Sequence, residues 1–231
     1  MFELIVTDPD SNVQEPEYKR LLGFPGDYVL EGRSRELADK TRQWYAQKGR
    51  PWIYARQIES LDLAGERLHV NGAVFSSRQL HDNFNAAQVH SALLAVVSAG
   101  RECEEKAGDL WREGKPDEYF FMEMYGSAVV EQLMATAGAQ LWDEAASKQM
   151  GVLPHHSPGY VGWDIGEQPR LLQLLPCPLE TLDSGMLRPK KSLLGVFGVT
   201  RHLDRVKRLT GVPQCGDCGM PACSYRRIAV Q

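Results

Sequence analysis

Three cysteines near the C-terminus, Cys215, Cys218 and Cys223, carry the most specific chemical signal in the sequence. Their C-x₂-C-x₄-C spacing is typical of a metal knuckle, in which a tight turn brings two thiolates onto one ion. Gly216 and Gly219 give the backbone the freedom that such a turn needs. Structural zinc and iron–sulfur clusters both take four ligands. The spacing therefore predicts a site for zinc or an iron–sulfur cluster that is one ligand short.

Cys177, His155 and His156 are candidates for the missing ligand. Pro176 and Pro178 hold the Cys177 thiol between rigid flanks, and imidazole suits both zinc and iron. Simpler interpretations stay open: Cys177 as a buried structural thiol, the histidines as ordinary loop residues, and the terminal cysteines as reduced thiols in a glycine-rich tail. The residue types alone do not decide which metal, if any, is bound.

A second candidate site is the loop Ser157-Pro158-Gly159-Tyr160, which follows the two histidines. The proline stiffens this loop, and the glycine lets its backbone come within hydrogen-bonding distance of a ligand. The tyrosine ring can stack on a purine, or its hydroxyl can donate a hydrogen bond. An ordinary turn with a half-buried tyrosine uses the same residues, so the loop alone does not establish a binding site.

The elements that position these residues are expected to form one α+β domain over residues 1–231, with 210–231 as a cysteine-rich tail. The patterns predict helices at 34–48, 76–85, 101–113, 117–150 and 200–209, with Ser34 as the N-cap of the first. A further helix is expected to begin with a capping box of Asp164 and Glu167 and to end near residue 175. They predict strands at 52–55, 58–63, 68–70, 89–97 and 192–199. Residues 1–34 are expected to be turn-rich.

Two glycines interrupt the last expected strand. Gly195 and Gly198 leave room there for close approach by a ligand or by another segment of the chain. A glycine within a strand weakens it unless something uses the space. The pair therefore predicts a close contact on this strand, without saying whether a ligand or protein makes it.

Composition excludes some classes of protein. No run of about 18 apolar residues is present, so no membrane span is expected. The first residues include Glu3 and lack a basic region, so no signal peptide is expected. Five cysteines, three of them clustered, favour a reducing cytoplasm over a disulfide framework.

Positive charge is concentrated at the C-terminal end. From Arg188 onward nine basic and two acidic residues give a net charge of +7, in a chain whose net charge is −4. This end is either a solvated surface or a face for an anionic group, such as a phosphate, a carboxylate or an acidic protein. Phe197 and Tyr225 are the segment's only aromatic residues, so it offers few stacking platforms and nucleic acid is not expected as a partner.

The stretch from His155 onward resembles the activation (reactivation) domain of cobalamin-dependent methionine synthase, and most closely its free-standing members. The resemblance is strongest over residues 150–200, and it rests on the order of Ser157–Tyr160, Trp163, Glu167-Gln168, Ser184, Met186-Leu187, Lys191-Ser192, Gly195 and Gly198. Weaker similarity extends upstream to Ser98-Ala99-Gly100 and to Gly126-Ser127-Ala128 followed by Glu131. A terminal cysteine cluster is associated with some free-standing members.

The resemblance implies a fold, a ligand and a partner. The fold would be a bent, mostly antiparallel β-sheet flanked by helices. The domain would bind S-adenosylmethionine, or a related nucleoside, and support reductive methylation of cobalamin on a corrinoid-dependent methyltransferase or corrinoid protein. One electron would come from a flavodoxin- or ferredoxin-type donor. In the family an R-x-x-P-G-Y loop contacts the nucleoside, so the implied ligand-binding residues are His155, Ser157, Pro158, Gly159, Tyr160, Lys191 and Ser192.

One position departs from the family pattern. His155 stands where the family has an arginine that pairs with the carboxylate of the ligand. Histidine is shorter, has no fork of donors and is largely neutral at pH 7. Arg188, Lys190 or Lys191 would then substitute, or the ligand differs, or the site has lost it. The alternative function is an iron–sulfur or zinc-binding redox accessory of a corrinoid protein, without S-adenosylmethionine, whose basic end docks an acidic electron donor.

Overall fold

Antiparallel strands form the central sheet, in the order β1-β2-β6-β10-β7. The computed structural model describes residues 2–58, 60–65 and 67–206. The sheet consists of β1 (Glu3–Val6), β2 (Trp52–Gln57), β6 (Ser91–Ser98), β7 (Gly151–Val152) and β10 (Ser192–Thr200). Every neighbouring pair of strands is antiparallel. The expected α+β fold with a mostly antiparallel sheet is therefore confirmed.

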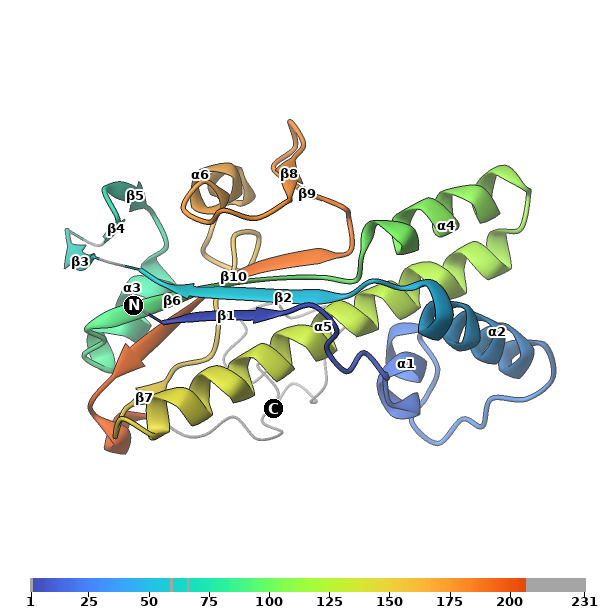
Figure 1. Ribbon diagram of the computed structural model, residues 1–231, viewed down its shortest axis with the longest axis horizontal. Helices are drawn as coiled ribbons and strands as arrows, with labels where there is room; N and C mark the ends of the chain where they lie inside the picture. The colour runs from blue at the N-terminus through green and yellow to red at the C-terminus, as the bar shows by residue number, and fades with distance from the viewer. Residues whose placement is uncertain (1, 59, 66, 207–231) are drawn as a thin grey trace.

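One face of the sheet is covered by a single long helix, α5 (Pro116–Ala146), which contacts β2, β6, β7 and β10. Three more helices pack against α5 and gather at one end of the sheet (Figure 1): α1 (Glu15–Leu21), α2 (Gly32–Lys48) and α4 (Arg101–Arg112). No helix in the described part of the chain is long and apolar enough to cross a membrane.

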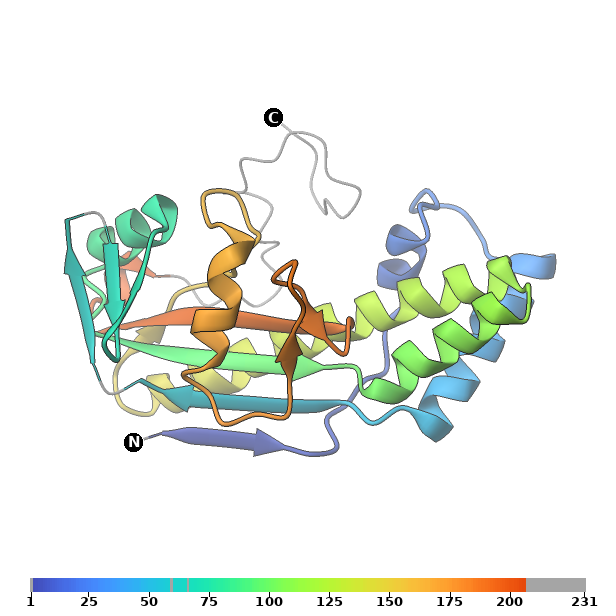
Figure 2. The ribbon, with the colours of Figure 1, turned by 90° about the horizontal axis from the view of Figure 1, so that it is seen from above.

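Smaller elements cover the opposite face, as Figure 2 shows. At one end lie α3 (Arg78–Ala86) and a small sheet of β3 (Leu61–Ala64), β4 (Arg67–Val70) and β5 (Ala73–Phe75). The middle carries the short helices η1 (Ile165–Glu167) and α6 (Gln168–Leu172), and the hairpin of β8 (Glu180–Thr181) and β9 (Leu187–Arg188). A last short helix, η2 (Leu203–Arg205), follows β10.

The two faces of the sheet bury two separate hydrophobic cores. Side chains alternate between the faces of a strand. In β6, accordingly, Leu93, Ala95 and Val97 point into the α5 core, while Ala92, Leu94 and Val96 point into the opposite core. Both sets are almost completely buried. The continuous apolar run predicted as a buried strand is thus explained by burial on both faces.

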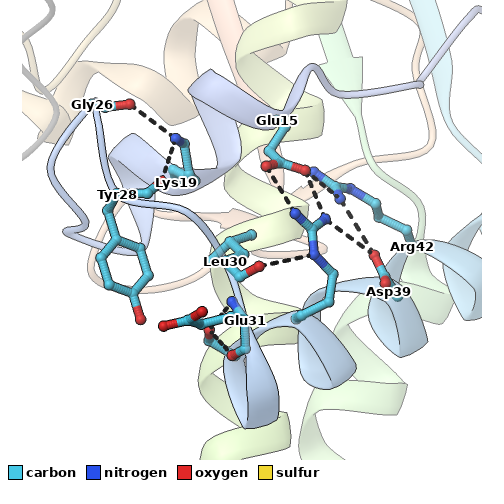
Figure 3. Close-up of polar contacts among 10 residues, drawn as sticks. Glu15, Lys19, Gly26, Tyr28, Leu30, Glu31, Asp39 and Arg42 are labelled. Carbon is cyan, nitrogen blue, oxygen red and sulfur yellow. Dashed lines mark hydrogen bonds and ion pairs between the residues drawn. The ribbon is translucent and has the colours of Figure 1, made fainter.

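The N-terminal segment holds more structure than its turn-rich sequence suggests. It contains β1 and α1, and α1 is fixed by tertiary contacts: the Tyr18 hydroxyl donates to the Phe121 carbonyl oxygen of α5 at 2.7 Å. The buried Lys19 ammonium donates to the carbonyl oxygens of Gly26 and Tyr28 at 2.9 and 2.7 Å, as Figure 3 shows. A buried charge is tolerated when it is hydrogen-bonded in this way.

The beginning of α2 differs from the prediction. The helix begins at Gly32, and Glu31 is its N-cap, so Ser34 is the third helical residue. The Ser34 side chain hydrogen-bonds back to the Glu31 backbone, which completes a capping box with the roles of the two residues reversed. Nearby, Arg35 and Arg42 on α2 bind Glu15 at 2.8 and 3.6 Å and so join α2 to α1.

The predicted capping box at Asp164 and Glu167 does not form. Asp164 caps only the short η1, where its carboxylate accepts from the Gly166 N–H at 2.6 Å. The Glu167 carboxylate turns away and accepts from the Trp163 indole N–H at 2.7 Å and the Ser76 N–H at 3.0 Å. The expected helix to residue 175 is therefore the shorter α6, which ends at Leu172. The expected helix at 200–209 is wrong over its described part, where Thr200 belongs to β10 and only η2 forms.

Candidate functional site

The loop predicted to contact a ligand is built from two consecutive turns. The Tyr160 N–H donates to the Ser157 carbonyl oxygen at 3.0 Å, and Gly159 lies between them with φ +91°. A Pro–Gly pair with this glycine conformation forms a type II turn. The third residue of such a turn needs a positive φ, which residues other than glycine rarely adopt. The second turn closes when the Trp163 N–H donates to the Tyr160 carbonyl oxygen at 3.0 Å. The sequence Pro158-Gly159 thus fixes the shape of the loop.

Strand β10 anchors this loop to the central sheet. The Leu153 N–H donates to the Gly198 carbonyl oxygen at 2.8 Å. His156 and Val196 exchange two backbone hydrogen bonds, at 3.0 and 2.9 Å. The chain after β7 therefore follows the free edge of β10 before it turns at Ser157. An edge strand offers unpaired backbone groups, and here they place the loop.

The two strand glycines make room for protein side chains. A Cβ atom at Gly195 would lie 3.1 Å from the His155 ring. At Gly198 it would lie 2.8 Å from both the Phe84 ring and a methyl group of Val89. Of the two interpretations left open by the sequence, close approach by another segment is the one that the described residues support.

His155 is held in place by aromatic and polar contacts. Its Nε2 atom lies 3.0 Å from the Tyr160 hydroxyl oxygen. Its ring centroid lies 5.5 Å from that of Phe197, and the ring also faces Gly195. Burial, with a smaller contribution from neighbouring His156, lowers the pKa of His155 to about 3. The imidazole is therefore neutral at physiological pH and is hydrogen-bonded to the tyrosine of the loop.

The neighbouring pair, His156 and Ser157, carries two unsatisfied polar atoms. The His156 ring stacks on Trp163, with centroids 5.9 Å apart and planes 7° apart. Its Nε2 atom and the Ser157 Oγ atom are both buried and have no hydrogen-bond partner among the described residues. Buried polar atoms usually have a partner, because leaving one unpaired costs about 1–3 kcal/mol. The loop thus has spare hydrogen-bonding capacity close to its turn.

We expect His155 to make stability depend on pH. Because its folded pKa of about 3 lies below the ordinary value of 6.5, the unfolded chain binds a proton here that the folded protein does not. Stability contributed by His155 is present above pH 6.5 and is lost as the pH falls toward 3. Between pH 7.5 and 5.5 this loss should be about 1.4 kcal/mol.

Urea unfolding at pH 7.5 and 5.5 measures this effect in the wild type and in His155→Gln, which keeps a polar group near Tyr160. The variant should lose about 1.4 kcal/mol less than the wild type over this interval, because glutamine does not titrate. Equal losses in the two proteins would show that folding does not lower the pKa of His155.

A supporting contact was not predicted from the sequence. Trp163 is almost completely buried, and its indole N–H donates to Glu167, whose carboxylate also accepts from the Ser76 backbone. Trp163 also forms a β-bridge with Ser77. These contacts tie the loop to the segment before α3. Trp163 and Glu167 are four residues apart, but Ser76 is distant in sequence, so no local pattern indicates the contact.

Lys191 and Ser192, the other implied ligand-binding residues, lie apart from the loop. The loop pairs with Val196, four residues further along β10 than Ser192, which corresponds to about 13 Å of strand. The Lys191 ammonium lies 2.8 Å from the Glu123 carboxylate and 3.1 Å from the Ser127 hydroxyl of α5. The Ser192 hydroxyl donates to Ser98 on β6 at 2.9 Å. Both side chains make structural contacts.

The two other basic residues considered as substitutes contact Glu104 of α4. Arg188 lies 4.0 Å from the Glu104 carboxylate of α4. The backbone N–H of Lys190 donates to the same carboxylate at 2.8 Å. Lys190 also lines a cleft of about 400 Å³ between α4 and α5, together with Trp111 and Tyr119. A second cleft, of about 240 Å³, lies between α2, α4 and α5. Neither cleft includes a residue of the His155–Tyr160 loop.

Cys215, Cys218 and Cys223 lie outside the described residues, as does the rest of the tail at 210–231. Within residues 2–58, 60–65 and 67–206, no group of three or more His, Cys, Asp or Glu side chains could hold a metal ion. Cys177 is a half-buried free thiol, and burial raises its pKa, which disfavours the thiolate that binds metals. The proposed metal site therefore rests on the cysteine spacing in the sequence.

Comparison with known proteins supports the fold. No family model matches the chain, and no curated protein matches it in sequence. The structure is similar to the crystal structure of the MetH reactivation domain bound to AdoHcy, with a TM-score of 0.65 and 10 % sequence identity. The match covers 86 % of this chain and 78 % of that chain. At this identity the similarity establishes that the chain has the α+β fold of that reactivation domain.

Proposed function

We propose that this chain is a reactivation-domain-like protein that binds an adenosyl ligand, S-adenosylmethionine or a related nucleoside. In this proposal it supports reductive methylation of a corrinoid-dependent methyltransferase or corrinoid protein. The carrying observation is the loop from His155 to Tyr160: a Pro–Gly type II turn fixed to the edge of β10, within the fold of a domain solved with AdoHcy.

The residues of the loop fit the nucleoside part of such a ligand. Gly159 is exposed and has no side chain, so a ligand can reach the backbone of the turn. The half-exposed Tyr160 ring offers a surface for a purine, and its hydroxyl is oriented by His155. Together these groups supply stacking and hydrogen bonding without any charge.

In the proposed reaction the protein positions the reactants. S-adenosylmethionine would supply the methyl group, a flavodoxin- or ferredoxin-type donor one electron, and the corrinoid on the partner would accept both. The contribution of this chain is to hold the adenosyl group rigidly and orient it, which lowers the entropic cost of the reaction. His155 and Tyr160 supply that rigidity through their mutual hydrogen bond.

Replacing Gly159 by alanine tests the binding loop. A side chain at φ +91° is strained, and its Cβ would lie 3.1 Å from Ile165, so the turn must change shape. We expect the variant to bind S-adenosylmethionine at least about tenfold more weakly in isothermal calorimetry, equivalent to about 1.4 kcal/mol.

Gly114→Ala is the matched control, because Gly114 also has a positive φ (+69°) but has open space around it and lies between α4 and α5. This control carries a similar backbone strain and should bind like the wild type. If the wild-type chain gives no heat with S-adenosylmethionine or AdoHcy, alone or with a cobalamin-loaded partner, the proposed function fails. If Gly159→Ala binds as tightly as Gly114→Ala, the loop is not the binding site.

We also propose, from the spacing alone, that Cys215, Cys218 and Cys223 hold an iron–sulfur cluster or zinc. A cluster would make this end of the protein a redox relay to the corrinoid, and zinc would make it a structural staple. Anaerobic purification followed by visible absorption and by iron and zinc analysis separates these cases. Metal-free protein that remains folded would leave the cysteines as ordinary thiols.

A further inference from the structure

We propose that the cleft between α2, α4 and α5 binds a small monocarboxylate with an apolar chain, and that Lys106 of α4 holds the carboxylate. The cleft has a volume of about 240 Å³ and includes no residue of the His155–Tyr160 loop. The proposal is therefore independent of the proposed function. It rests on the apolar lining of the cleft, on the charges at its rim and on its size.

The apolar lining comes from three helices that meet at one end of the sheet. Helices α2 and α4 both pack on α5 (Figure 1), and residues of all three line the cleft. Leu37, Leu110 and Met122 are each at most 3 % exposed, and the half-buried Trp44 ring adds to this lining. A chain of CH₂ groups placed here is removed from water, which favours its binding. Methionine also adapts its shape to the chain that it contacts.

The rim of the cleft carries one cation more than it has acids. Its charged residues are Lys40, Lys106 and Glu118. The Lys40 ammonium lies 2.8 Å from the Glu118 carboxylate, and this hydrogen bond lowers the pKa of Glu118, so the two charges satisfy each other. Lys106 is half-buried and forms no ion pair with the acidic residues that the structure describes. Since buried charges are normally paired, Lys106 is the group that an anionic ligand would complete.

Acidic residues around Lys106 are directed elsewhere or bound by other cations. Glu102 lies one turn before Lys106 on α4, but its buried Oε2 atom is 2.7 Å from the position of a Cβ atom at Gly100. The pKa of Glu113 is lowered mainly by its hydrogen bond with Lys115 and to a smaller extent by Lys106. Two of these acids have ion-pair partners of their own: Asp109 binds Arg112, and Glu113 binds Lys115.

The polar groups at the rim favour a ligand with a single negative charge. Gln43 and Gln47 lie one turn apart on α2, and each carries an amide that can donate hydrogen bonds to a carboxylate oxygen. The Glu118 carboxylate in the same rim disfavours a second negative charge. A cleft of about 240 Å³ is smaller than the roughly 300–1,000 Å³ typical of sites for drug-sized ligands. These features together indicate a small monocarboxylate.

Three compounds with the same apolar chain test the head group: octanoate, octan-1-ol and octylamine. In calorimetric titrations of the full-length wild-type chain, octanoate should bind at least about tenfold more tightly than octanol, because only the carboxylate forms a charge-assisted contact with Lys106. Octylamine, a cation at pH 7, should bind no more tightly than octanol. Butyrate should bind at least about tenfold more weakly than octanoate, because it buries fewer CH₂ groups. No saturable binding of octanoate, or an affinity equal to that of octanol or of butyrate, overturns the proposal.

Variants of Lys106 test whether this residue holds the carboxylate. Lys106→Met should lower the affinity for octanoate to that for octanol, and Lys106→Glu should reverse the preference in favour of octylamine. Lys148→Met is the control, because Lys148 is 52 % exposed, follows the end of α5 and does not line the cleft. With all variants shown to be folded by circular dichroism, an equal loss of octanoate binding in Lys148→Met and Lys106→Met would overturn the proposal. S-adenosylmethionine titration tests the loop separately, so failure of either proposal leaves the other standing.

Discussion

Replacing Lys191 by methionine is expected to lower the free energy of unfolding by about 3 kcal/mol, because it leaves the Glu123 carboxylate without its cation. The Lys191 and Glu123 side chains are only 14 % and 17 % exposed, and the two charged atoms lie 2.8 Å apart. Breaking a buried ion pair from one side typically costs more than removing both partners. Urea unfolding followed by circular dichroism measures the change.

The double variant Lys191→Met/Glu123→Gln should recover most of this loss, since no unpaired charge remains. Arg33→Met is the control, because Arg33 and Glu36 form an ion pair of the same length, 2.8 Å, with side chains 56 % and 64 % exposed. It should cost less than about 0.5 kcal/mol. If Lys191→Met costs no more than Arg33→Met, the ion pair is not structural, and Lys191 becomes available for a ligand.

A valine at Gly198 is expected to destabilise the protein by about 3 kcal/mol or more, although valine favours strands in general. The first added carbon would lie 2.8 Å from both Phe84 and Val89, closer than side-chain carbons pack. Both neighbours are buried in the core opposite α5, and Phe84 is 1 % exposed, so neither side chain can move into solvent.

Gly108→Ala provides the comparison, because Gly108 lies within α4 with no atom within 4 Å of an added Cβ. Alanine should stabilise this helix by about 0.5–1 kcal/mol. In the Gly198→Val background, Phe84→Leu should return part of the lost stability by freeing volume. Thermal unfolding with a midpoint equal to the wild type for Gly198→Val would contradict the close contact between β10 and α3.

The elements that sequence patterns predicted well are those whose signal is local. The apolar run of β6 needs no distant information, and neither does the repeat of buried residues at every fourth position of α5, because burial sets their period. In α5 these residues are Phe121, Tyr125, Val129, Leu133, Ala137, Leu141 and Ala145. Elements held by distant contacts were missed. Helix α1 has only seven residues, too few to be stable alone, and depends on the Tyr18 bond to α5. Strand β1 has four residues, and its partner among the described residues is β2.

In the candidate site, too, local features could be predicted from the sequence and distant contacts could not. Pro158 and Gly159 predict their own turn, because φ preferences are local. The contact of His155 with Gly195, and that of Glu167 with Ser76, depend on which segments the fold brings together. The predicted capping box at Asp164 was wrong for this reason, since the Glu167 carboxylate instead accepts from the Trp163 indole N–H and from the backbone N–H of the distant Ser76. The ion pair of Lys191 with Glu123 was equally invisible in the sequence.

Burial of the sheet on both faces has a consequence for strand alignment. A half-buried strand that slips by one residue exposes its apolar side chains, and this penalty normally fixes the pairing. In β10 both faces are apolar, so a slip would only exchange one apolar set for the other. The volume of the side chains then has to select the alignment. A one-residue slip would bring Phe197 or Val199 to the position where Gly198 leaves space for the Phe84 ring. The larger side chain would clash with that ring, so Gly198 fixes the register of β10 by steric exclusion.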